Sequence, residues 1–164
     1  MGIELTRYVR PECFVQDLVE KSRDDALRRI VHTVAEKGLI KDENDLFVKL
    51  VERENIQSTG VGNGIAVPHC LSDEIPDLMI IVARSLSGVE FNSFDGKPTQ
   101  VIILLICSSQ EHGLHVKALM QIARLIKRKG FIEKIISSTS VQDMVRAFDE
   151  EESTLIVSRQ GAQS

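Results

Sequence analysis

One histidine beside a glycine-rich segment is the feature of this chain most suited to chemistry. Residues 58–64 read Ser-Thr-Gly-Val-Gly-Asn-Gly, and His69 follows them after a short apolar run that ends in Pro68. Proline fixes the backbone before the histidine and ends strand pairing, so we expect His69 at a strand end beside the loop. Histidine is mostly neutral near pH 7 and can act as a nucleophile. Taken alone, the glycines favour a tight turn before a strand, but the adjacent His69 also suggests an anion site.

Two further side chains could complete such a site. His115 falls in the first turn of a predicted helix, where the helix dipole favours a neutral imidazole or a bound anion. Arg53 ends the helix before the glycine segment, and a guanidinium offers paired donors to phosphate oxygens. Sites in α/β sheets form at strand ends, so we expect both side chains to meet His69 at one sheet edge. The loop would add donors from its hydroxyls and amides: Ser58, Thr59, Gly60, Gly62 and Gly64.

Three other kinds of chemistry fit the sequence less well. A nucleotide cradle runs strand, glycine loop, helix, whereas here a helix precedes the loop and a strand follows it. A zinc site could draw on suitable residue types, namely His69, Cys70, Cys107, His112 and His115, but their spacing matches no standard pairing. Cys107 with His115 could form a nucleophile and base, although Cys107 more simply closes a buried strand. We therefore expect no metal and no cofactor.

The elements that must position these residues can be read from apolar periodicity. Helices are predicted at residues 24–37, 44–53, 114–129, 131–137 and 141–148, and strands at 65–67, 78–83, 101–107 and, more weakly, 89–94. Residues 101–107 are apolar without alternation, which indicates a strand covered on both faces. We predict an α/β single-domain sandwich, in which a mixed β-sheet is flanked by helices on both faces. The domain should span residues 5–149, with residues 150–164 as a C-terminal tail.

Composition narrows the classes of function. The chain has 164 residues and a net charge of −4, which argues against a general nucleic-acid binder. No run approaches the roughly 18 apolar residues of a membrane span, so we expect no direct membrane insertion. The three cysteines have no paired spacing, which is typical of free thiols in a reducing compartment. These features predict a cytoplasmic protein.

The signature Ser-Thr-Gly-Val-Gly-Asn-Gly-Ile-Ala-Val-Pro-His at residues 58–69, preceded by Glu-Arg-Glu at 52–54, resembles a known active site. It is similar to that of the fructose/mannitol-type enzyme IIA domains of the bacterial sugar phosphotransferase system, a class that includes the nitrogen-regulatory enzyme IIA proteins. The segment His-Val-Lys-Ala-Leu at 115–119 also resembles the family's second histidine segment. The resemblance covers about residues 5–149.

This resemblance implies a phosphoryl carrier. His69 would take a phosphoryl group on its ε nitrogen from the phosphocarrier protein HPr, or from its nitrogen-branch relative. His115 would stabilise the phosphorylated state and Arg53 would steady the charge. The phosphate would then pass to an enzyme IIB component or remain as a regulatory mark that controls binding to a target protein. The triplet Gly62-Asn63-Gly64 is frequent in nitrogen-type members and favours the regulatory branch. Cys70-Leu71-Ser72 follows the histidine, where many relatives carry a small residue and then a basic one.

Overall fold

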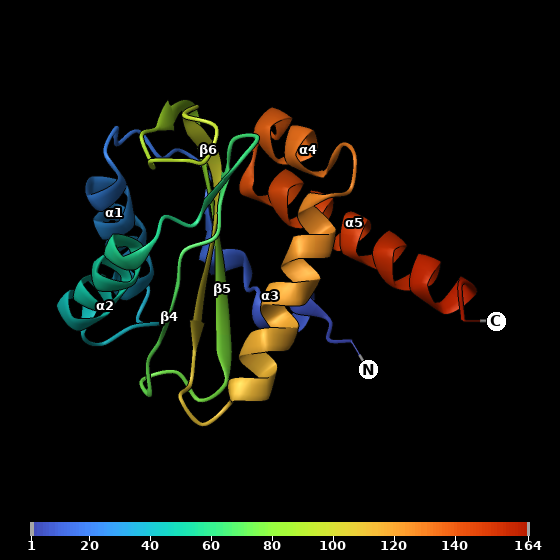
Figure 1. The fold of residues 1–164 in the computed structure, drawn as a ribbon, viewed down its shortest axis with the longest axis horizontal. Helices are drawn as coiled ribbons and strands as arrows, with labels where there is room; N and C mark the ends of the chain where they lie inside the picture. The colour runs from blue at the N-terminus through green and yellow to red at the C-terminus, as the bar shows by residue number, and fades with distance from the viewer. Residues whose placement is uncertain (1, 164) are drawn as a thin grey trace.

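A six-stranded mixed sheet forms the centre of the molecule, in a computed structural model that describes residues 2–163 (Figure 1). The strand order is β1-β5-β6-β3-β2, and β4 also pairs with β6. The strands are β1 (Phe14–Val15), β2 (Gly60–Gly62), β3 (Ile65–Ala66), β4 (His69–Leu71), β5 (Leu78–Val89) and β6 (Thr99–Cys107). β6 is antiparallel to β5 and parallel to both β3 and β4, so the predicted mixed sheet is confirmed.

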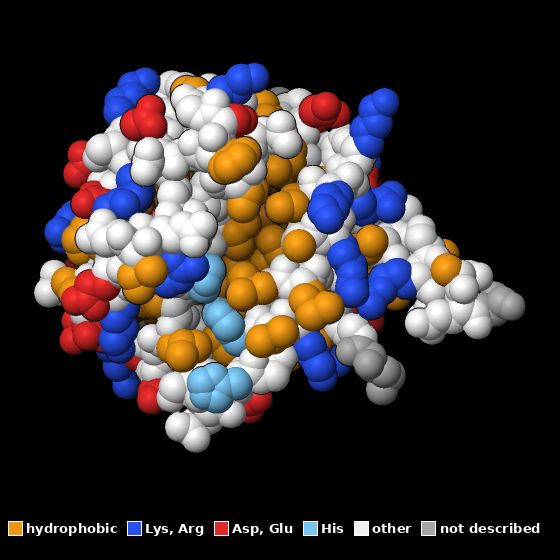
Figure 2. All heavy atoms as spheres, viewed as in Figure 1, with side chains coloured by type: hydrophobic (Ala, Val, Ile, Leu, Met, Phe, Trp, Pro, Cys, Tyr) orange, Lys and Arg blue, Asp and Glu red, His pale blue; other side chains and the backbone are white. Residues whose placement is uncertain are grey.

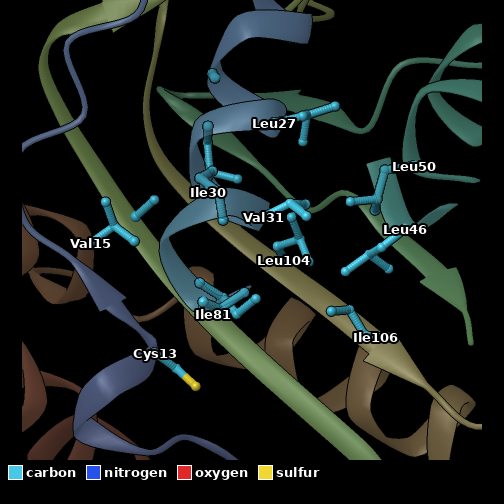
Figure 3. Packing of buried hydrophobic residues seen from close by; sticks show 14 of the residues in the cluster. Cys13, Val15, Leu27, Ile30, Val31, Leu46, Leu50, Ile81, Leu104 and Ile106 are labelled. Atoms are coloured by element: carbon cyan, nitrogen blue, oxygen red, sulfur yellow. The ribbon is translucent and has the colours of Figure 1, made fainter. Parts of the chain in front are cut away.

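Helices cover both faces of this sheet, as predicted (Figure 1). One face carries α1 (Arg23–Glu36) and α2 (Glu43–Ile56), and the other carries α3 (His112–Ile126), α4 (Phe131–Ser137) and α5 (Val141–Gly161). Apolar side chains form one core on each face of the sheet. Figure 3 shows the core beneath α1 and α2, which contains Leu27 and Ile30 of α1 and Leu50 of α2. Because strand side chains alternate, Leu104 packs in that core while Leu105 packs in the other.

The helix boundaries follow local rules. Ser22 Oγ accepts the backbone N–H of Asp25 at 3.2 Å, and Asp42 Oδ1 accepts that of Asp45 at 3.0 Å, so each side chain caps the start of its helix. Gly38 follows α1 with a φ of +76°, a conformation that glycine adopts without strain. No helix among residues 2–163 is long and apolar enough to cross a membrane.

Several predicted elements need correction. The glycine-rich segment, which we expected to be a loop, contains a strand, because Gly60–Gly62 forms β2 and pairs with β3 in a hairpin. Strand β5 extends the predicted 78–83 strand to Val89, where the weaker 89–94 strand was expected. The short strand β1 had no periodic signal in the sequence, since it contains two residues only.

The prediction that the last helix ends at residue 148 is also wrong. α5 continues to Gly161, and two acidic residues past the predicted end are buried. Glu152, 1% exposed, accepts the backbone N–H groups of Leu5 and Thr6 at 2.9 Å each. Glu151 pairs with Arg128 at 2.9 Å and Lys134 at 2.6 Å. The apolar pattern fades here because carboxylates anchor the helix to its neighbours.

Candidate functional site: a histidine pair at the edge of an apolar cleft

His69 opens a strand of its own. We predicted it at the end of the strand 65–67, but it begins β4, where it pairs with Leu105 of β6. The carbonyl of Pro68 accepts the N–H of Leu105 at 3.0 Å, so the chain continues along the same neighbour after the proline. Alternation along β4 sends Cys70 into the α1–α2 core, whereas His69 is half-buried on the other face. Cys70 therefore cannot join His69 as a metal ligand.

A backbone hydrogen bond sets the proton position on His69. The Nδ1 atom lies 2.9 Å from the carbonyl oxygen of Val67. A carbonyl can only accept, so Nδ1 carries the hydrogen and Nε2 keeps its lone pair. No hydrogen bond between described residues engages Nε2. His69 lines a cleft of about 320 Å³, so its side chain belongs to an accessible site.

His115 lies beside His69, as predicted. It occupies the first turn of α3, and the two ring centroids are 5.4 Å apart with an angle of 55° between the planes. Burial lowers the pKa of His115, and the nearby rings of His69 and His112 lower this pKa further. Its Nδ1 atom is buried and has no hydrogen-bond partner among the described residues. The ring is therefore neutral near pH 7 and holds unused hydrogen-bonding capacity next to His69.

Arg53 reaches the same cleft from the last turn of α2. Its Nη1 donates to the carbonyl oxygen of Gln57 at 3.0 Å, which fixes the side chain at the end of the helix. Arg53 and His69 both line the cleft, and Arg53 forms no ion pair with any residue in 2–163. A guanidinium has five N–H donors, so this bond leaves several free for an anion.

The hydroxyls of the loop are already engaged. Ser58 Oγ donates to the carbonyl of Phe91 at 2.8 Å and accepts the N–H of Gly60 at 3.0 Å. Thr59 donates its hydroxyl to Glu54, and its N–H donates to the same carboxylate at 3.0 Å. Ser58 and Thr59 line the cleft, so either hydroxyl would have to exchange its present partner to bind an anion.

The three glycines shape the hairpin rather than the cleft wall. Gly62 and Gly64 have positive φ angles of +91° and +78°, which side chains rarely tolerate. A Cβ on Gly60 would lie 2.9 Å from the Cα of Ser93, so glycine is required there for close approach of the chain. None of Gly60, Gly62 and Gly64 is among the residues that line the cleft.

An apolar wall completes the cleft, and the sequence did not identify it as part of the site. Figure 2 shows histidine side chains at the edge of an apolar hollow with Lys and Arg side chains on its far side. The apolar lining comes from the hairpin and α3: Val61, Val67, Leu119, Ile122, Ala123 and Ile126. The α3 positions recur at helical spacing, a pattern that is typical of a buried helix face. Only Ile122 of this set on α3 is fully buried, and Ala123 is exposed.

Known proteins resemble this chain in sequence. Residues 7–151 match the family model described as "Phosphoenolpyruvate-dependent sugar phosphotransferase system, EIIA 2". The chain is 30% identical over 138 residues to a nitrogen regulatory protein of Bradyrhizobium diazoefficiens, covering 84% of this chain and 90% of the relative. It is 26% identical over 121 residues to a fructose-specific EIIA component of Haloferax volcanii, covering 74% and 79% of the two chains.

Solved structures share the fold. The nitrogen regulatory protein IIA-Ntr of Neisseria meningitidis superposes with a TM-score of 0.80 at 23% identity, covering 88% of this chain and 98% of the other. The mannitol enzyme IIA of Escherichia coli, solved in complex with its phosphorylated enzyme IIB, gives 0.70 at 18% identity, covering 85% and 95%. The chain therefore belongs to the type 2 enzyme IIA family and is a phosphoryl-transfer component of the phosphotransferase system.

Proposed function

We propose that His69 is the residue that carries the phosphoryl group, and that Nε2 is the atom to which it binds. The observation that supports this most directly is the 2.9 Å hydrogen bond from Nδ1 to the carbonyl of Val67. It keeps the hydrogen on Nδ1 and leaves the Nε2 lone pair available in the cleft. The phosphoryl donor would be HPr or its nitrogen-branch relative, as the family resemblance implies.

The transfer needs no group on this chain beyond His69, Arg53 of the same cleft and the neighbouring His115. The Nε2 lone pair attacks phosphorus, an N–P bond forms, and the N–P bond of the donor's phosphohistidine breaks as its electron pair returns to the donor ring. Phosphoryl transfer depends mainly on positioning and charge stabilisation. The free donors of Arg53 would bind the phosphoryl oxygens, and His115, at 5.4 Å, would become a second donor once it is protonated.

The loop would contribute in a second way. Of the loop residues expected to bind phosphate, Ser58 and Thr59 line the cleft and would do so by exchanging their present hydrogen-bond partners, whereas Gly60, Gly62 and Gly64 do not line it and would act by shaping the hairpin. Glu54 lies 2% exposed and holds Thr59 through two hydrogen bonds. Thr59 in turn accepts the N–H of Val67 at 3.1 Å, and Val67 accepts Nδ1 of His69. The loop thus fixes the nucleophile relative to α2.

Two fates of the phosphate remain as proposals. In the first, His69 passes it to an enzyme IIB component, as the mannitol complex from Escherichia coli suggests by analogy. In the second, the phosphate is a regulatory mark that changes affinity for a target protein. The second is favoured by the 30% identity to a nitrogen regulatory protein and by the higher TM-score of IIA-Ntr, 0.80 against 0.70.

The test is a phosphotransfer assay with enzyme I, HPr or its nitrogen-branch relative, and phosphoenolpyruvate. The wild-type protein should gain one acid-labile phosphate and His69→Ala should gain none. Labelling that persists in His69→Ala would disprove the site. Adding candidate enzyme IIB proteins separates the two fates, because only a transport component loses its label to a IIB acceptor.

A further inference from the structure

A fully exposed phenylalanine lies next to the glycine hairpin. Phe94 is 95% exposed, although the loop that carries it, residues 91–98, begins with Phe91 at 0% exposure and ends beside buried Thr99. An aromatic side chain in water is about 2–3 kcal/mol less stable than the same side chain buried. Full exposure of Phe94 on a loop held by hydrogen bonds therefore indicates a contact with another molecule.

The loop is held in place by hydrogen bonds on both sides of Phe94. The N–H of Phe94 donates to the carbonyl of Gly60 at 3.0 Å. Ser93 Oγ and Thr99 Oγ1 lie 3.1 Å apart in a buried contact. Asp95 accepts the N–H groups of Asn63 at 3.0 Å and Lys97 at 3.1 Å, so it ties the loop to the tip of the hairpin.

The glycines of the hairpin make this attachment possible. A Cβ on Gly60 would meet Ser93 Oγ at 2.5 Å, and one on Gly62 would meet the Asp95 carboxylate at 3.3 Å. Residues 60 and 62 are therefore glycine partly because the loop lies directly against β2. The backbone under Phe94 is thereby fixed, and an aromatic side chain on a fixed backbone loses little entropy when it binds a partner.

The same hairpin forms one wall of the His69 cleft. Val61, which follows Gly60, is 51% exposed and lines the cleft together with His69. The Phe94 loop is thus continuous with the rim across which a phosphoryl group must pass. Aromatic residues on such rims are frequent anchors in protein interfaces.

We propose that Phe94 is an anchor for the protein that donates phosphate to His69, and that it inserts into an apolar recess near that protein's phosphohistidine. This inference rests on the proposed function. The donor is the chosen partner because both fates of the phosphate require it, whereas an enzyme IIB acceptor is needed by only one.

The experiment compares Phe94→Ala with the wild type using the phosphorylated phosphocarrier protein from the same genome as donor. The KM for that donor should rise about tenfold or more while kcat stays within about twofold, and Phe94→Leu should recover part of the loss. Val157→Ala is the matched control, because Val157 is 67% exposed on the projecting end of α5 (Figure 1) and should leave KM unchanged.

A small phosphoryl donor, phosphoramidate, separates docking from chemistry. It needs no protein interface, so Phe94→Ala and the wild type should be phosphorylated on His69 at the same rate. An unchanged KM for the protein donor in Phe94→Ala would overturn the anchor, and so would an equal loss with phosphoramidate. If neither donor phosphorylates the wild type, the proposed function itself fails, and the anchor fails with it.

Discussion

Phosphorylation of His69 should bring a proton onto His115. In the free protein the pKa of His115 is lowered by burial and by its neighbouring rings, so the ring is neutral near pH 7. A phosphoryl group on His69 places nearly two negative charges beside it. The Nδ1 atom of His115 is buried and has no hydrogen-bond partner among the described residues. When His69 is phosphorylated, the negative charge nearby favours the imidazolium form of His115, in which both ring nitrogens carry a hydrogen.

The size of the effect follows from the distance between the rings. The ring centroids are 5.4 Å apart, and a negative charge at that separation would stabilise an imidazolium by about 3 kcal/mol at an effective dielectric constant of about 20. Both rings are half-buried, so we take roughly half of this value per charge. Nearly two charges then give about 3 kcal/mol, or an approximately hundredfold gain in proton affinity.

The sign of the pH dependence is fixed by this coupling. Phosphorylation raises the pKa of His115, so the phosphorylated state binds more protons, and lowering the pH through the window between the two pKa values favours that state. In this window each decrease of one pH unit should favour the phosphorylated protein by about tenfold. This change adds to the pH dependence that comes from titration of the phosphate and of the donor. His115→Asn should lose the extra pH dependence, and His112→Asn, an exposed neighbour on the same helix turn, should keep it.

The measurement is a ¹⁵N NMR titration of the histidine rings, with phosphoenolpyruvate, enzyme I and the phosphocarrier protein present to maintain the label. The His115 nitrogens should titrate at a higher pH in the phosphorylated protein than in the free protein, by about two pH units. The same titration midpoint for the His115 ring in both states would refute the coupling.

Three further perturbations test other parts of the structure. Glu152→Ala leaves two buried backbone N–H groups without acceptors and should lower the free energy of unfolding by about 3 kcal/mol in urea titrations, with Glu152→Gln losing less; equal stability would show that α5 is not anchored there. Thr59→Val removes a donor from the buried Glu54 carboxylate and should destabilise by about 2 kcal/mol, whereas Thr59→Ser should remain close to wild type. Arg53→Ala should slow phosphate acceptance about 10- to 100-fold, and Arg53→Lys should recover only part because it lacks paired donors; an unchanged initial rate would remove Arg53 from the mechanism.

Local sequence signals predicted most of the helical layers. Ser22 caps the start of α1 and Asp42 caps the start of α2. The periodic apolar residues of α1 determine which face of that helix is buried. Neither signal depends on distant parts of the chain. The same reasoning failed for α5 beyond residue 148. Glu151 and Glu152 look like surface residues in the sequence, and only the tertiary fold reveals the basic side chains and N–H groups that satisfy them.

In the candidate site, contacts near in the sequence orient His69, whereas contacts distant in the sequence position His115. Glu54 holds Thr59, Thr59 accepts the N–H of Val67, and Val67 accepts Nδ1 of His69, so one short segment of chain sets the orientation of this imidazole. The contacts that orient His69 are therefore local in the sequence. The position of His115 depends instead on how β4 pairs with β6, because α3 follows β6 directly.

The register of β4 against β6 determines which face of the sheet His69 occupies, and the sequence alone does not give this register. Since the side-chain period of a strand is two, a shift of one residue in the pairing of His69 with Leu105 would turn the imidazole into the α1–α2 core and bring Cys70 to the cleft. The pairing is held by the N–H of Leu105, which bonds to Pro68, and by Cys70 packing among apolar side chains. The residue after the histidine therefore has a structural part in the site. A small apolar side chain at position 70 stabilises the register that presents His69 to His115.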